Sequence, residues 1–356
     1  MTTMLPWSEG VVARRISQLR EHIQSSGSTD RAGCKSTLSV PVAKPAPQPL
    51  RVVLIGETGG GGYGHGLEKL FVGRSDGVVV AIADSDKAKR AEVAAQIGNP
   101  TQYDDWRVMV AAEKPDLVVI AERWSERHFE ISKACLEAGA HIFMEKPLLP
   151  TMADADHLMA LSRDKGLRFT VKHEMQLSPN LRWLKEKLDE GIIGEKLLQI
   201  DAYGKMDRRA GGEELAVLGG HIFDLCRMWC GCDALWCHAR VTTEARTVTK
   251  ADVKFSAGDH VGPLIGDEIN ATFLMANGTL LTYTSREDQQ AVQQIGWGVV
   301  LTGTTGVIRV SFGIPQVIEM RHRDGNTDTW LPIDGDPIIL EDTCAGVSQS
   351  SFIDRD

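Results

Sequence analysis

Residues 51–66 read Arg-Val-Val-Leu-Ile-Gly-Glu-Thr-Gly-Gly-Gly-Gly-Tyr-Gly-His-Gly, and this stretch decides the fold of the first half of the chain. Arg51–Ile55 is a short β-branched run, apolar enough for a strand that is buried on both faces. Glycine then dominates, and Leu67–Phe71 begins a helical pattern. A strand, a glycine turn and a helix together predict a phosphate-binding corner, because glycine lets the backbone approach a pyrophosphate and a helix N-terminus offers free N–H groups. A merely flexible glycine loop is the alternative.

A second buried strand sharpens this prediction. Gly59, Gly61 and Gly64 form a Gly-x-Gly-x-x-Gly frame, and the run Gly77–Asp84 that follows ends in an acid. A dinucleotide fold places there the carboxylate that bonds the adenosine ribose hydroxyls. A carboxylate at this position repels a 2′-phosphate, so Asp84 favours NAD, while nearby Lys87, Lys89 and Arg90 keep NADP as the alternative.

Composition limits the class of protein. The chain has 356 residues, 42% hydrophobic and 24% charged residues, and a net charge of −9. This length allows two domains with cores of their own, and the negative charge without a basic stripe argues against nucleic acid as a partner. No apolar run reaches the roughly 20 residues of a membrane helix, and we expect no secretory signal because the N-terminal residues lack an apolar core segment. Seven irregularly spaced cysteines fit reduced thiols, so we expect a cytoplasmic protein that does not bind membranes.

The pattern along the chain predicts four parts. Residues 1–48 combine an amphipathic helix with a Pro-rich linker, and residues 336–356 look like a tail. Residues 49–171 alternate strands with helices, which predicts a doubly wound parallel sheet, an α/β Rossmann domain. Residues 172–335 predict an α+β domain, to which the family resemblance described below assigns substrate binding and oligomerisation.

The expected elements of the Rossmann domain after Asp84 are helices over 87–97, 124–138 and 151–165, and strands over 115–121, 141–144 and 167–171. In the second domain we expect a helix over 178–188, a strand over 195–203, a charged glycine-rich loop over 205–220 and a helix over 221–229. Three consecutive hairpins follow, with turns at 276–278, 303–305 and 324–326, and they predict a mainly antiparallel open sheet.

Two further motifs complete a resemblance to a known family. Residues 137–147 read Glu-Ala-Gly-Ala-His-Ile-Phe-Met-Glu-Lys-Pro, and residues 219–224 read Gly-Gly-His-Ile-Phe-Asp. Together with the glycine turn and Asp84, they resemble the Gfo/Idh/MocA oxidoreductases, the glucose–fructose oxidoreductase and inositol dehydrogenase family, from about Leu50 to Ile333. The resemblance implies a nicotinamide cofactor, a small-molecule substrate, and homodimers or homotetramers that form through the antiparallel sheet.

Lys146 is the first candidate catalytic residue. A lysine beside a proline after a buried strand has a fixed backbone and a partly desolvated ammonium, which could orient a substrate hydroxyl and share its proton. The resemblance assigns this role to Lys146, places a cis peptide bond before Pro147, and puts Glu145 near the nicotinamide ribose. The alternative is a lysine that is merely paired to Glu145 at a strand end. The residues expected to bind the cofactor are Gly56, Thr58, Gly59, Gly61, Gly62, Tyr63, Gly64, Asp84, Arg123, Glu145 and Lys146.

His221 is the second catalytic candidate, because histidine is the side chain whose unperturbed pKa lies nearest neutrality. A histidine that caps the helix or packs in the core is the alternative. Many family members carry Asp four residues earlier, where this chain has Val217, so a His–Asp relay is missing or is supplied by Asp207, Glu213 or Glu214. The residues expected to bind substrate are Lys146, His173, Asp207, Arg208, Glu214, His221 and Asp224.

Other residues leave alternatives open. Lys172, His173 and Glu174 are substrate contacts or ordinary polar residues at a strand end. The cysteines between residues 226 and 237, with His238, do not form two Cys-x-x-Cys pairs, so we expect packed thiols and no metal. The segment 121–124 replaces the family's usual Thr-Pro-Asn turn and puts the cofactor contacts there in doubt.

The sequence therefore predicts an NAD(P)-dependent oxidoreductase that transfers hydride between the cofactor and a secondary alcohol of a sugar, sugar acid or cyclitol, with Lys146 and His221 handling the proton. One alternative is redox-neutral lyase, glycosidase or epimerase chemistry through a transient keto intermediate. The other is a regulatory protein that binds NAD(H) without turnover.

Overall fold

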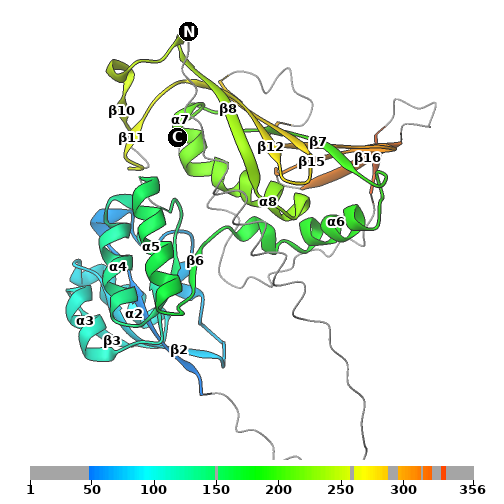
Figure 1. Ribbon diagram of the computed structural model, residues 1–356. Coiled ribbons are helices and arrows are strands. Elements are labelled where there is room, and N and C mark those ends of the chain that lie inside the picture. The colour runs from blue at the N-terminus through cyan, green and yellow to red at the C-terminus, as the bar shows by residue number, and fades with distance from the viewer. Residues whose placement is uncertain are drawn as a thin grey trace, which may run out of the picture. The chain divides into compact units, whose positions relative to one another are not determined.

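The computed structural model describes residues 48–148, 151–256, 260–287, 296–313, 316–322 and 330–333. The predicted N-terminal helix, nearly all of the linker and the predicted tail lie outside these residues. The described chain forms a six-stranded sheet and a nine-stranded sheet, each with its own helices (Figure 1). The boundary predicted between residues 171 and 172 lies directly after the last strand of the first sheet and stays a prediction.

The first sheet confirms the doubly wound fold. Its order is β3-β2-β1-β4-β5-β6, and every neighbouring pair is parallel. This order places the crevice beyond the carboxyl ends of β1 and β4. The strands are β1 (Leu50–Ile55), β2 (Gly77–Ala83), β3 (Thr101–Tyr103), β4 (Leu117–Ile120), β5 (His141–Met144) and β6 (Phe169–Val171). The helices are α2 (Lys87–Gln96), α3 (Trp106–Glu113), α4 (His128–Glu137) and α5 (Met152–Asp164), and a 3-10 turn over Ser125–Arg127 precedes α4.

Local signals place these helices. The side chains of Asp86, Asp105 and Thr151 accept backbone N–H bonds at the starts of α2, α3 and α5, as N-caps do. Gly139 has a φ of 91° just after α4, which is the left-handed conformation that glycine adopts at a helix end. The central strands are buried on both faces, which explains their unbroken apolar runs.

The helix expected after the glycine turn is wrong. Only three-residue 3-10 turns form, η1 (Thr58–Gly60) and η2 (Leu67–Lys69). Gly64 and Gly66 hold φ values of 63° and 80°, so no right-handed helix can begin before Leu67. The rings and side chains of Tyr63, Leu67 and Phe71 pack on the face of β1 and β2 instead. The loop therefore offers backbone N–H groups without the dipole of a long helix.

The second sheet has the order β17-β16-β15-β14-β7-β13-β12-β8-β9. The hairpins β12–β13 and β14–β15 confirm two predicted turns, and β16–β17 confirms the third pairing, whose turn lies outside the described residues. The sequence missed β8, β9 and the separate β10–β11 pair. The strands are β7 (Leu197–Tyr203), β8 (Ala234–Thr243), β9 (Arg246–Thr247), β10 (Lys254–Phe255), β11 (Pro263–Leu264), β12 (Glu268–Met275), β13 (Leu280–Arg286), β14 (Gly298–Gly303), β15 (Gly306–Ser311), β16 (Val317–His322) and β17 (Leu331–Pro332).

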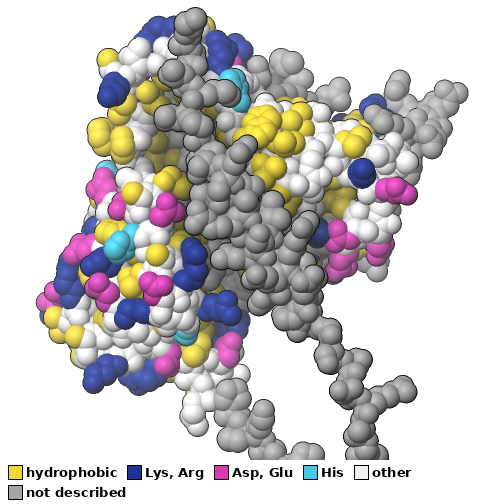
Figure 2. Space-filling model, viewed as in Figure 1, with side chains coloured by type: hydrophobic (Ala, Val, Ile, Leu, Met, Phe, Trp, Pro, Cys, Tyr) yellow, Lys and Arg dark blue, Asp and Glu magenta, His cyan; other side chains and the backbone are white. Residues whose placement is uncertain are grey.

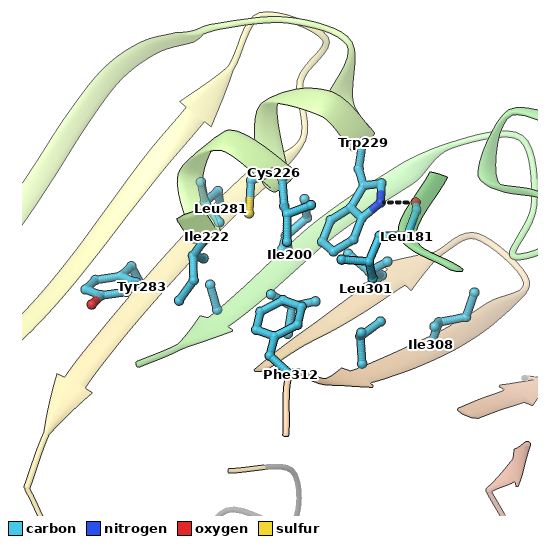
Figure 3. Close-up of a cluster of buried hydrophobic side chains, with 14 of the residues drawn as sticks. Leu181, Ile200, Ile222, Cys226, Trp229, Leu281, Tyr283, Leu301, Ile308 and Phe312 are labelled. Atoms are coloured by element: carbon cyan, nitrogen blue, oxygen red, sulfur yellow. Dashed lines mark hydrogen bonds between the residues drawn. The ribbon is translucent and has the colours of Figure 1, made fainter. Parts of the chain in front are cut away.

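Helices α6 (Pro179–Asp189) and α8 (Gly220–Cys230) lie along one face of this sheet (Figure 1). Ile222, Leu225, Cys226 and Trp229 of α8 point at the sheet and are almost completely buried. Trp229 also donates a hydrogen bond to the carbonyl of Leu181 at 3.3 Å, which ties α8 to α6 (Figure 3). This core fixes which face of α8 is left for other contacts.

The charged loop expected over residues 205–220 is half wrong, because its second part is helical. After Gly211, whose φ is 85°, the chain forms α7 (Gly212–Glu214) and a π-helical segment η5 (Leu215–Gly219) that runs directly into α8. Val217 and Leu218 pack there against Leu264 and its neighbours. The sequence did not predict this helix because its glycines are unfavourable in helix interiors. A π-helical turn widens the backbone and is frequent at functional sites.

Basic and acidic side chains intermingle over α3, α4 and α5 on the face that Figure 2 shows. Exposed pairs such as Arg107–Glu130 and Lys133–Glu137 belong to this mixture. That face therefore presents no basic stripe to a nucleic acid. None of the described helices is long and apolar enough to cross a membrane.

Candidate functional site

The glycine loop packs closely against the ends of β1, β4 and β5. A Cβ atom on Gly56 would meet the Tyr63 ring at 2.3 Å, and one on Gly64 would meet the carbonyl of Ala121 and Glu145 Oε2 at 2.8 Å. Gly61 likewise leaves no room for a side chain, whereas Gly62 has nothing within 4 Å. The loop is therefore a cradle that needs glycine at defined positions.

Asp84 lies at the end of β2, as predicted, but its carboxylate faces the loop. Oδ1 accepts hydrogen bonds from the backbone N–H of Thr58 (3.2 Å) and of Asp86 (2.9 Å), and Oδ2 accepts one from Thr58 Oγ1 (2.8 Å). Only 2% of Asp84 is exposed. A ribose hydroxyl could bond to this carboxylate only if Thr58 no longer donates its hydrogen bonds to Asp84.

Glu145 anchors the other end of the loop. This fully buried carboxylate accepts a hydrogen bond from His65 Nδ1 at 2.8 Å, and Lys172 Nζ lies 3.9 Å away. Lys172 also donates to the carbonyl of His65 at 2.8 Å. Burial alone would raise the pKa of Glu145, but the His65 hydrogen bond and the charges of His65, Lys172 and Lys146 outweigh it and lower the pKa to about 2. The sequence missed His65 and its link to Glu145.

Lys146 follows at the end of β5, is 9% exposed, and its bond to Pro147 is cis, as the resemblance implied. The backbone around it is held by His128, which is fully buried. Nδ1 of His128 lies 3.0 Å from the carbonyl oxygen of Pro147, and Nε2 lies 2.9 Å from that of Glu122. Burial lowers the pKa of His128, so the neutral ring donates to one of these two carbonyl oxygens while it packs between the turns after β4 and β5. The sequence assigned His128 no role beyond its place in the helix expected over 124–138.

Three of the predicted substrate-binding residues, His173, His221 and Asp224, come together near Lys146. The rings of His173 and His221 meet edge to face with centroids 5.4 Å apart, and His173 Nδ1 lies 4.0 Å from Asp224 Oδ1. Lys146 is close enough for its charge to act on both histidines. His221 and Asp224 share a face of α8 because they are three positions apart. Gly220 makes this approach possible, since a Cβ there would lie 3.1 Å from His173 Nε2.

Burial sets the protonation states of this cluster. Burial lowers the pKa of His221 to about 4; the positive charge of Lys146 adds to this shift, and the negative charges of Glu174 and Glu145 oppose it. Burial also lowers the pKa of His173 and raises that of Asp224. Both imidazoles are therefore neutral near pH 7, the form that accepts a proton.

Several buried polar atoms have no hydrogen-bond partner among the described residues. In the catalytic cluster these are His221 Nδ1, Asp224 Oδ2 and Glu174 Oε2. Beside the glycine loop they are the Ser125 hydroxyl and both carboxylate oxygens of Glu122. Unpaired buried polar atoms are rare in folded proteins, and their concentration in these two places marks both as candidate functional regions.

The remaining predicted substrate residues lie differently. Asp207 is paired with Arg209 at 2.7 Å, and Arg208 is exposed. Glu214 is fully buried, accepts the N–H of Met206 at 2.9 Å and a hydrogen bond from the Ser285 hydroxyl, and so holds the loop against β13. The described contacts of Glu214 therefore give it a structural place, and its substrate role stays a prediction.

The cysteines bear on a metal site. Cys135 and Cys226 are buried free thiols, and burial raises their pKa values. Within the described part of the chain, no group of three or more His, Cys, Asp or Glu side chains could hold a metal ion.

Comparison with known proteins agrees with this geometry. Residues 50–173 match the oxidoreductase family with an NAD-binding Rossmann fold. The chain is 25% identical over 248 residues to D-glucoside 3-dehydrogenase of Escherichia coli (strain K12), a match that covers 65% of this chain and 69% of that protein. It is 32% identical over 151 residues to inositol 2-dehydrogenase 1 of Saccharopolyspora erythraea, and this match covers 42% and 44% of the two chains.

A solved structure shows the same fold over most of the chain. Levoglucosan dehydrogenase, in complex with NADH and levoglucosan, superposes with a TM-score of 0.62 at 22% identity, and the match covers 82% of this chain and 81% of that one. The two-sheet fold is thus shared with a protein of known structure.

Proposed function

Because residues 50–173 mark the chain as a member of the Gfo/Idh/MocA oxidoreductases, we propose that it is an NAD-dependent dehydrogenase acting on a secondary alcohol of a sugar, sugar acid or cyclitol. The observation that carries this proposal is the convergence of Lys146 with His173, His221 and Asp224. The names of the relatives, a glucoside dehydrogenase and an inositol dehydrogenase, support this substrate class.

The residues divide the chemistry among them. Bound NAD supplies the hydride acceptor. Neutral His221 accepts the proton of the reacting hydroxyl, because its pKa near 4 leaves it unprotonated. The Lys146 ammonium stabilises the negative charge that develops on that oxygen. His173 lies against His221 and Asp224, so it can pass the proton onward, while Asp224 orients a neighbouring hydroxyl.

The cofactor's place follows from the loop. Backbone N–H groups of the glycine cradle would hold the pyrophosphate, and Glu145 would hold the nicotinamide ribose. Asp84, with the Glu57 carboxylate nearby, favours NAD, because both would repel the 2′-phosphate of NADP. Glu57 lies beside this edge, where it contacts Ser85 and pairs with Arg127 at 3.1 Å.

One observation favours a second candidate, redox-neutral chemistry through a transient ketone. Val217 packs in an apolar cluster at the position where the family resemblance implies a relay Asp, and His221 Nδ1 has no hydrogen-bond partner in the described structure. A histidine without a carboxylate partner is free to serve as a base at a neighbouring carbon. Such an enzyme would regenerate NAD within each turnover.

Absorbance at 340 nm separates the candidates. Net formation of NADH with a panel of sugars, sugar acids and cyclitols supports the dehydrogenase, and product formation without net change supports the redox-neutral enzyme. We expect Lys146→Ala and His221→Ala to lose at least about 100-fold in kcat, whereas the exposed control Lys114→Ala does not. NAD binding without turnover, unaffected by Lys146→Ala, would instead indicate a regulatory protein, and failure to bind NAD or NADP would refute the assignment.

We propose that the protein is cytoplasmic and that the face of the second sheet opposite α6 and α8 forms a homo-oligomer interface. Phe273 faces the helices and packs on Phe223, so its strand neighbour Leu274 faces the other way, opposite Trp236. Trp236 is 48% exposed on β8. Light scattering should show a dimer or tetramer that Trp236→Glu weakens.

A further inference from the structure

We propose that a groove along the C-terminal half of α8 binds a second, neutral sugar unit joined to the one that reacts. The inference rests on the dehydrogenase function proposed above. It makes the preferred substrate a disaccharide or a similar glycoside.

The groove is a cavity of about 370 Å³. This volume lies within the range of small-molecule sites. It opens between α8 and the short turn Glu174–Leu177 that precedes α6. Its lining residues are Gln176, Asp224, Arg227, Met228, Gly231, Cys232 and Asp233.

Asp224 joins this groove to the catalytic cluster. Its Oδ1 lies 4.0 Å from His173, and its Oδ2 is buried and has no hydrogen-bond partner in the described structure. At 1.5 Å per residue along a helix, Gly231 lies about 10 Å beyond Asp224. A substrate that reacts beside His221 can therefore extend past Asp224 into the groove.

The lining selects the chemistry of that extension. Gln176, Asp224 and Asp233 offer donors and acceptors for hydroxyl groups, and Met228 offers an apolar surface for the C–H side of a ring. Arg227 is bound to Asp233, with Nε 2.7 Å from Oδ1. Two carboxylates against one guanidinium leave an excess of negative charge, which disfavours a nucleotide diphosphate and favours a neutral, hydroxylated group.

The test compares sugars with their glycosides at saturating NAD. The pairs are glucose with maltose and cellobiose, galactose with lactose and melibiose, and myo-inositol with galactinol. We expect at least one glycoside to exceed its parent about tenfold in kcat/KM. Met228→Trp, which fills the groove, should remove that advantage, and Met152→Trp, at an exposed position on α5, should keep it. Saturation-transfer NMR measures binding of the same sugars independently of turnover.

The outcomes distinguish the two proposals. If parent sugars are oxidised and the glycosides have no advantage, or if Met228→Trp leaves the advantage intact, the groove assignment fails and the dehydrogenase stands. If glycosides bind to the wild type but not to Met228→Trp and no sugar reduces NAD, the groove stands and the dehydrogenase fails. If nothing binds or reacts, or if uridine diphosphate sugars outperform the glycosides, the groove assignment is overturned.

Discussion

Replacing Glu122 by glutamine should stabilise the protein at alkaline pH. Glu122 follows β4, is 0% exposed, and neither carboxylate oxygen has a hydrogen-bond partner among the described residues. The nearest charge is Arg127, whose Nη2 lies 3.6 Å from Oε2. Burial raises the pKa of Glu122 from 4.5 to about 7, because Arg127 offsets only part of the cost and the charges of Glu57, Glu130 and Asp84 add to it.

The magnitude follows from linkage. A carboxyl with a higher pKa in the folded than in the unfolded state binds its proton more tightly when folded, so stability falls as pH rises from 4.5 through 7. A difference of about 2.5 pH units, at 1.36 kcal/mol each, gives a loss of about 3 kcal/mol above pH 8. Glu122→Gln stays neutral and avoids this loss, which corresponds to roughly 5 °C in the melting temperature.

Thermal unfolding at pH 5, 6, 7, 8 and 9 measures the effect. The wild type and Glu122→Gln should converge near pH 5 and separate above pH 7, with the variant more stable. Glu126→Gln, an exposed neighbour on the same turn, should follow the wild type at every pH. If Glu122→Gln and the wild type keep parallel melting curves from pH 5 to 9, the buried carboxyl titrates elsewhere and the reasoning is refuted.

Three further predictions concern the loop and the cluster. Gly64→Ala should weaken NAD binding at least about tenfold by calorimetry, because its Cβ would meet oxygen atoms at 2.8 Å. Gly62 has a φ of 74° but open space around it, so Gly62→Ala should lower the stability of the fold by only the backbone strain of about 1 kcal/mol. The pKa of Glu145 is lowered to about 2, so its carboxylate stabilises the fold above pH 4.5, and this stabilisation is lost as the pH falls toward 2. In urea unfolding, His65→Phe should remove much of this decrease of the unfolding free energy at low pH. The pKa of His221 near 4 predicts that kcat/KM for oxidation shows no inflection near pH 6.5, and a clear inflection there would contradict a neutral buried imidazole.

Much of the fold could be predicted because its signals are local. The runs at 51–55 and 141–144 match β1 and β5 closely, and the Asn277-Gly278 turn fixed the register of β12 and β13. The prediction of a helix after the glycine loop was wrong because whether a glycine adopts a left-handed φ depends on the packing around it, which the sequence does not show. Strand β8 was not predicted because its first seven residues are all exposed, so the strand does not alternate between buried and exposed positions.

The site could be predicted where chain topology alone brings residues together. Glu145 and Lys146 end β5, His173 lies just after β6, and His221 and Asp224 are three residues apart on one helix face. The sequence could not predict which of these side chains are buried and bonded within the protein. Asp84 and Glu214 are the right residue types at the expected places, yet both carboxylates bond to the protein's own backbone. Glu122 left one signal, an acid directly after the apolar run 117–121.

Buried polar atoms without hydrogen-bond partners mark functional regions that the sequence alone does not reveal. Each buried donor or acceptor without a partner costs about 1–3 kcal/mol, so a fold keeps a group of them only where something outweighs the cost. His221 Nδ1, Asp224 Oδ2 and Glu174 Oε2 lie in one cluster, and the oxygens of Glu122 and Ser125 lie beside the glycine loop. These two groups coincide with the expected substrate and cofactor positions. Ligands that satisfy them should therefore raise the melting temperature, and NAD together with a sugar should raise it more than either alone.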